Sequence, residues 1–203
     1  NLVLKKSNFY LNNQNNDFFT KLLDGDFQNS KLIIKDSNIF YKNKDDEVLF
    51  INKILNMQYF YDNKNFYNKA LSKNEIFNLP YFFEIRKNNT EKKYFSTLNL
   101  SYLKLKIDNE LDYSEKVKAG TINFLFNKDK FNSTYRINED NLIFNVSDSV
   151  DNSNFSFKGK VNLNPFYSNL EGVIKKFNVL NLINSYSPIL QLLKTEILNN
   201  KNL

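Results

Sequence analysis

The side chains that most often carry enzyme chemistry are missing from this sequence. Neither histidine nor cysteine occurs among its 203 residues. Their absence removes the usual general base, the thiol nucleophile, and the imidazole and thiolate ligands of most zinc, copper and iron sites. Without cysteine the chain has no disulfide, so its composition does not indicate the redox compartment. We therefore expect a non-enzymatic protein, with no catalytic residue, metal ion or cofactor.

Carboxylates are the remaining candidates for acid–base chemistry. They occur as three pairs, Asp24 with Asp26, Asp45 with Asp46, and Glu139 with Asp140. A glycosidase holds two carboxyl groups roughly 5 to 10 Å apart across a cleft. The three pairs lie instead in predicted turns, where acids are common, so we expect no catalysis from them. An unrecognised carboxylate-based hydrolase stays a third hypothesis, and it requires an acid pair that faces a pocket.

The charge balance is basic, but the basic residues form no block. The chain has 28 Lys and Arg against 22 Asp and Glu, a net charge of +6, and its only arginines are Arg86 and Arg136. A basic surplus can indicate an acidic partner such as nucleic acid or a phospholipid surface. Here the lysines alternate with acids throughout, so we interpret them as a solvated face and expect no nucleic-acid partner.

Strands are the elements that must position these side chains. From Phe155 to Leu163 apolar residues fall on alternate positions, a period of two that indicates a strand with one apolar and one wet face. Pro165 ends this run, because proline cannot donate to a strand ladder. A second extended run is predicted from Leu170 to Phe177.

The same alternation recurs along most of the chain. Two extended runs between Ser30 and Tyr61 flank a polar turn and predict a long hairpin. Further runs predict a meander of antiparallel strands over 81–85, 95–107, 121–126, 131–137 and 142–146. Within 95–107 the apolar residues change face at Leu103, which we interpret as a slip in one strand. Residues 108–115 are assigned no element, and 62–78 show no clear pattern.

The turns and the two ends of the chain follow other rules. With only four glycines, many turns must use Asn or Asp. Residues 1–30 are predicted to be irregular with one short helical turn, ended near Gly25, which suits a left-handed cap.

At the C-terminal end, an amphipathic stripe predicts two short helices, at about 178–185 and 188–199, packed against the sheet. No apolar run of about eighteen residues occurs, so we expect no membrane-spanning helix, and the absence of an initial Met suggests an excerpt from a longer protein.

A long sheet with one apolar face must either cover that face or use it. The expected C-terminal helices can cover only part of it, and an uncovered strip would suit a chain-like ligand such as a lipid acyl tail. The residues predicted to line the strip are Phe124, Phe126, Leu142, Phe144, Val146, Phe155, Phe157 and Val161. Each of them fits an ordinary closed core equally well, because both arrangements need the same alternation.

Three stretches resemble the C-terminal portion of the AsmA family of Gram-negative envelope proteins. They are Leu32–Tyr41 (LIIKDSNIFY), Glu75–Phe83 (EIFNLPYFF) and Phe157–Ile183 (FKGKVNLNPFYSNLEGVIKKFNVLNLI). The last is similar to a strand, Asn-Pro-Phe, strand and helix pattern, with Gly159, Asn164, Pro165 and Phe166 as its clearest positions. The likeness extends over most of residues 20–185.

The resemblance implies a periplasmic protein, anchored to the inner membrane by a segment outside this chain and related to TamB and the bridge-like lipid-transfer proteins. It implies an elongated β-groove and a role in envelope integrity, outer-membrane biogenesis or phospholipid transport. The implied partners are phospholipids or other acyl-chain lipids and envelope membrane proteins. The family has no catalytic residues to carry over to this chain.

These observations predict a mainly β fold: an elongated, curved antiparallel sheet, a β-groove or meander, with an apolar concave face and one or two short C-terminal helices. We expect a single domain over 1–203, divided into 1–30, a β-meander over 31–177, and amphipathic helices over 178–199. The predicted function is to bind or conduct lipid acyl chains along the apolar face. The alternative is a structural or adhesive β-domain of a surface or secreted protein with a closed core.

Overall fold

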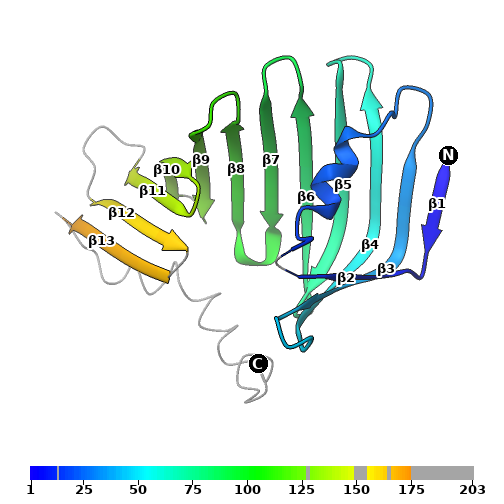
Figure 1. The fold of residues 1–203 in the computed structure, drawn as a ribbon, viewed down its shortest axis with the longest axis horizontal. Coiled ribbons are helices and arrows are strands. Elements are labelled where there is room, and N and C mark those ends of the chain that lie inside the picture. The colour runs from blue at the N-terminus through cyan, green and yellow to red at the C-terminus, as the bar shows by residue number, and fades with distance from the viewer. Residues whose placement is uncertain (13, 127–128, 149–154, 164–165, 175–203) are drawn as a thin grey trace.

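The chain forms one large, curved and open sheet, as the sequence predicts. A computed structural model describes residues 1–12, 14–126, 129–148, 155–163 and 166–174. All thirteen of the strands in these residues belong to the same sheet, with β1 at one edge and β13 at the other (Figure 1). The mainly antiparallel β fold is thereby confirmed. The helices predicted at 178–185 and 188–199 lie outside the described residues.

The strands follow one another across the sheet almost in chain order. They are β1 (Leu2–Lys5), β2 (Asn8–Leu11), β3 (Leu32–Lys42), β4 (Val48–Asp62), β5 (Tyr67–Ile76), β6 (Leu79–Asn88), β7 (Lys93–Leu100), β8 (Leu105–Asp112), β9 (Lys118–Phe126), β10 (Asp129–Asn138), β11 (Asn141–Asp148), β12 (Phe155–Leu163) and β13 (Phe166–Ile174). The short helix α1 (Phe18–Lys21) continues into the 3₁₀ turn η1 (Leu22–Asp24), and a second 3₁₀ turn, η2 (Ser101–Leu103), joins β7 to β8.

From β3 onward each strand pairs antiparallel with the next, so the predicted hairpin of β3 with β4 is confirmed. The N-terminal segment differs from the prediction. Residues 1–30 are not only irregular, because β1 and β2 both pair with β3 in parallel. Each has four residues, too few for a period of two to be recognised, and each exists by pairing with a longer strand. The short helical turn predicted in this segment is present as α1 and η1.

The single extended run predicted over 95–107 is wrong. The change of face at Leu103 is a hairpin connection, in which η2 reverses the chain and Lys104 has a φ of 50°. The strand β8 then runs to Asp112, through residues that the sequence pattern assigned to no element. The unclear segment 62–78 holds the whole of β5, in which small and polar residues weaken the apolar period.

Glycine plays a different part from the one predicted. Among the described residues, positive φ angles occur at nine positions, none of them glycine, and only Asp36, Asp46 and Asn78 are Asp or Asn. Lysine, phenylalanine and glutamate hold the other positions. The expectation of a left-handed cap at Gly25 is also wrong, because its φ is −68°.

Three glycines instead lie inside strands, beneath an aromatic ring of the neighbouring strand. In the register of the sheet Gly120 is opposite Tyr135, Gly159 is opposite Phe144, and Gly172 is opposite Phe157. A Cβ atom built on Gly159 would lie 2.7 Å from the Phe144 ring and 2.6 Å from Leu170 Cδ2. The missing side chain therefore makes room for the ring, and the ring covers a backbone that glycine would leave bare.

The buried core lies at the N-terminal end of the sheet. Leu23 of η1 and Ile34 and Ile54 of the sheet are completely buried, and Tyr59 is almost so. Figure 1 shows α1 lying across the face of the sheet near β5 and β6. Of the hydrophobic residues described, none beyond Ala70 in the chain is fully buried.

Polar contacts tie the helical segment to the sheet at the edge of this core. The Tyr59 hydroxyl donates to the Phe19 carbonyl oxygen at 2.9 Å. The Asn68 side-chain amide donates to the carbonyl oxygens of Leu23, at 2.7 Å, and Gly25, at 2.8 Å. Burial raises the pKa of Tyr59 well above its usual range, so its hydroxyl stays protonated and available as the donor.

The contact between glycine and ring predicts losses of different size at two glycines. Replacing Gly159 by Ala should lower the free energy of unfolding by about 1 to 3 kcal/mol, because the new methyl group overlaps Phe144 and Leu170. Replacing Gly25 by Ala should cost less than about 1 kcal/mol, because its φ suits any residue and the new methyl group would meet the Phe27 ring only at 3.1 Å. Urea denaturation measures both. Equal losses at the two positions would contradict the packing role of Gly159.

Candidate apolar binding face

The register of the ladders places the predicted lining residues on one face of the sheet. Across β11 and β12, Leu142 is opposite Val161, Phe144 is opposite Gly159, and Val146 is opposite Phe157. Phe124 and Phe126 of β9 lie on the same face as Val146. Phe124 is opposite Phe131, Ser133 is opposite Val146, and Phe131 and Ser133 lie two apart in β10. Phe155 holds the matching backbone position opposite Ile174, and its side chain lies outside the described residues. We call this surface, from β7 to β13, the apolar face.

This face is covered at one end and open at the other. The same side of β3–β6 carries the core residues that pack against Leu22, Leu23 and Phe27. Farther along, Phe157 keeps 39% of its surface exposed and Leu170 keeps 63%, whereas Ile54 at the covered end has none. In the part of the chain that the structure describes, the apolar side chains of β9–β13 are therefore only partly removed from water.

The structure adds residues to this face that the sequence prediction left out. One apolar row crosses five strands, in the order Phe83, Leu98, Ile107, Phe124 and Phe131. Leu98 and Ile107 were missed because 95–107 was interpreted as one strand, which placed them on opposite faces. Phe131 belonged to a correctly predicted strand, so its alternation with Ser133 was the signal that could have added it.

Polar groups interrupt the apolar face at one row. The Tyr135 hydroxyl donates to Asn109 Oδ1 at 2.8 Å, and Ser133 is 95% buried, with 5% of its surface exposed. Burial raises the pKa of Tyr135, while its hydrogen bond to Asn109 acts in the opposite direction. Because the Tyr135 hydroxyl and Asn109 bond to each other, these two polar groups stay compatible with apolar neighbours.

The opposite face is polar and crossed by ion pairs between neighbouring strands. Lys69 lies 2.7 Å from Glu84, Lys93 lies 2.7 Å from Glu110, and Lys158 lies 2.7 Å from Glu171. Partly exposed pairs of this kind contribute little stability each, on the order of 0.2 to 1 kcal/mol. They do keep this side of the sheet polar and hydrated, which distinguishes it from the apolar face.

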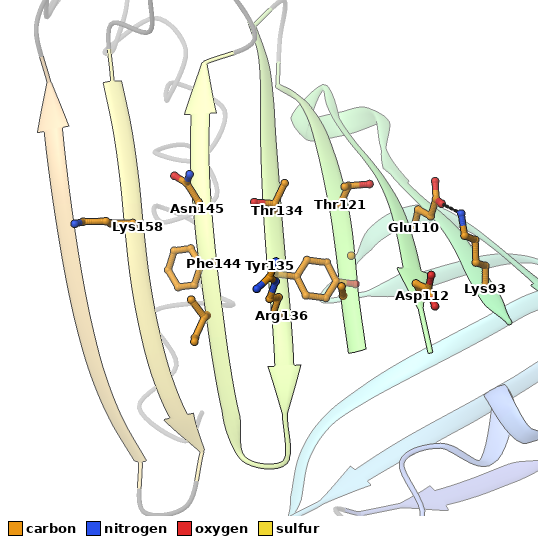
Figure 2. A pocket seen from close by; sticks show the side chains of 13 residues that line it. Lys93, Glu110, Asp112, Thr121, Thr134, Tyr135, Arg136, Phe144, Asn145 and Lys158 are labelled. Carbon is orange, nitrogen blue, oxygen red and sulfur yellow. Dashed lines mark hydrogen bonds and ion pairs between the residues drawn. The ribbon is translucent and has the colours of Figure 1, made fainter. Parts of the chain in front are cut away.

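A hollow of about 700 Å³ lies over β7–β12 on this polar face. Figure 2 shows Thr121, Thr134 and Asn145 side by side on neighbouring strands, with the ion pair of Lys93 and Glu110 at one end. The hollow lies on the side opposite to the one predicted to be concave and apolar, and polar side chains line it together with Ala119 and Ile143. We therefore describe the apolar face over these strands as a surface and infer no groove there.

The hollow brings together an acid pair that the sequence did not single out, Glu110 and Asp112. Glu110 accepts from Lys93, and hydrogen bonds from Ser114 hold the pKa of Asp112 below its usual range. A general acid needs the opposite shift, so this pair suits ionised, paired carboxylates better than acid catalysis. The three pairs predicted to lie in turns do so, and Lys42 bonds to Asp46 while Lys116 bonds to Glu139.

The described residues contain no group of three or more acidic side chains placed to hold a metal ion. Their helices are all too short to cross a membrane.

Comparisons with family models, with curated proteins and with solved structures find no match to this chain. The resemblance to the AsmA family therefore stays a prediction from the sequence.

The difference between the covered and open ends predicts how the sheet tolerates charge. Replacing Ile54 by Glu should cost more than about 4 kcal/mol or prevent folding, because the carboxylate would be buried without a partner. Replacing Phe157 by Glu should cost only about 1 to 2 kcal/mol, since a carboxylate there can reach water. Chemical denaturation followed by circular dichroism measures both losses. If Phe157→Glu unfolds the protein as Ile54→Glu does, this face is closed in solution.

Proposed function

We propose that the chain is a non-enzymatic protein that binds lipid acyl chains along the apolar face. The observation that carries this proposal is the mainly apolar surface from β7 to β13. No described element covers it, and its residues Phe157 and Leu170 are partly exposed. A surface of this kind marks an interaction site, because leaving it in water is unfavourable.

The chemistry of the face favours a chain-like apolar ligand. An acyl chain has no hydrogen-bonding groups, so it matches a surface that is mainly apolar and on which Tyr135 and Asn109 are already bonded to each other. The apolar row of Phe83, Leu98, Ile107, Phe124 and Phe131 crosses the strands, and it would let a chain lie across several of them. The contact would be broad and tolerant of ligand length.

The cellular setting of the proposal rests on the resemblance to the AsmA family. The protein would lie in the periplasm of a Gram-negative cell, anchored to the inner membrane by a segment outside this chain. It would move phospholipid towards the outer membrane or support outer-membrane biogenesis, together with envelope membrane proteins.

Neighbouring residues of β11 offer a matched test, because their side chains lie on opposite faces. Phe144 belongs to the apolar face, and Ile143, which is 52% exposed, belongs to the polar one. We expect phospholipid to co-purify with the wild-type chain in native mass spectrometry. Phe144→Glu and Phe157→Glu should lose it while remaining folded, and Ile143→Glu should keep it.

A folded, monomeric wild-type chain that carries no lipid, and takes none up from phospholipid vesicles, would argue against the proposal. Equal loss of lipid in the Ile143→Glu variant would also count against it, because binding would then not depend on the apolar face.

A structural or adhesive β-domain is the second candidate, and the edge strand β13 favours it. Tyr167, Leu170 and Val173 of β13 are between 57% and 63% exposed, and no described strand pairs with its outer side. Such an edge can accept a strand from another chain. Concentration-dependent association without lipid, abolished by Tyr167→Pro, would support this role over lipid binding.

A further inference from the structure

Lys87 is a cation placed on the apolar side of the sheet. It lies in β6, opposite Asn68 of β5 and Tyr94 of β7, and only 12% of its side chain is exposed. Its ammonium group bonds to the carboxylate of Asp24 in η1. The rings of Tyr94 and Tyr113, which contact each other, lie 5.4 and 5.8 Å from it, so an aromatic pair borders the charge on one side.

This lysine marks the border between the covered and open ends of the sheet. On one side of it, the Asn68 amide fastens the end of the helical segment. On the other side, its row in the sheet register continues through Tyr94, Leu111, Gly120, Tyr135 and Phe144. Lys87 is therefore the charged end of a row that is otherwise apolar or aromatic.

Neighbouring groups keep the Lys87 side chain protonated and charged. Partial burial acts to lower the pKa of Lys87, but the hydrogen bonds to Asp24 and Tyr94 and the negative charge of Asp24 outweigh it and raise that pKa. A cation held in this way requires an anionic partner. Its partner, Asp24, keeps 53% of its side chain exposed, so its carboxylate can turn to water when another anion replaces it.

We propose that Lys87 binds the anionic head group, a carboxylate or a phosphate, of an amphiphile whose chain lies along this row of the apolar face. The inference rests on the proposed function and names the ligand's polar end. In the complex the head group takes the place of Asp24 at the Lys87 ammonium group, beside the rings of Tyr94 and Tyr113. From Tyr94 to Phe144 the row crosses four strand intervals, about 19 Å at the usual strand spacing, which matches an extended long-chain acyl group.

The test uses two fluorescent probes with the same chain, cis-parinaric acid and its methyl ester. Replacing Lys87 by Met should weaken binding of the acid by about tenfold or more, because a charge-assisted contact is lost, and should change binding of the neutral ester less than about twofold. Lys87→Arg should retain most of the affinity for the acid. The matched control is Lys93→Met, because Lys93 also pairs with an acid but lies on the polar face, and it should alter neither titration.

The Asp24→Asn substitution should have the opposite effect on binding of the acid, and it changes no residue of the sheet. Removing the competing carboxylate should tighten binding of the acid several-fold and leave binding of the ester unchanged. A purely structural ion pair predicts otherwise, because Asp24→Asn and Lys87→Met would then affect both probes alike. This variant also decides the question if Lys87→Met fails to fold.

The outcomes separate this inference from the proposed function. If the wild-type chain binds both probes and neither variant discriminates between them, the head-group site is overturned and acyl binding stands. If the wild-type chain binds neither probe, the proposed function fails as well. If inorganic phosphate displaces the acid as effectively as octanoate does, the site holds small anions, and the inference of an amphiphile is overturned.

Discussion

The packing of one short helical segment on one end of the sheet is the interaction on which the rest of the structure depends. A sheet alone cannot bury its apolar side, and here Leu23 supplies the completely buried contact that does so over β3–β5. The hydrogen bonds from Tyr59 and Asn68 fix where the segment lies. The strands from β6 onward add to this folded end one hairpin at a time.

Away from this core the sheet is stabilised by contacts between neighbouring strands. Ladder hydrogen bonds, rings lying over glycines and ion pairs on the polar face each act across one strand interval. Such local contacts allow a sheet to remain open, because none of them requires a second layer. Over the described residues one face is thus left partly exposed, and this exposure is the premise of the proposed binding of acyl chains.

The two faces of the sheet carry different kinds of side chain. The polar face satisfies its charges within the sheet, through pairs such as Lys93 with Glu110. On the apolar side of the sheet, Lys87 lies at the border of the covered end, near two tyrosines and the helical segment. A surface that is apolar along its length and charged at one end has the polarity of an amphiphile, and this complementarity links the proposed function to the inference drawn from Lys87.

The sequence by itself determined the class of the fold and which predicted lining residues share one face of the sheet. Alternation placed Phe144, Phe157 and the other predicted lining residues on one side, because side chains two residues apart in a strand point to the same face. It did not reveal the hairpin at η2, since a turn that reverses the chain and a slip that flips the face give the same pattern. Only the tertiary structure decided which glycines lie under rings, where α1 and η1 cover the sheet, and that Asp24 meets Lys87, because these contacts join residues far apart in the chain.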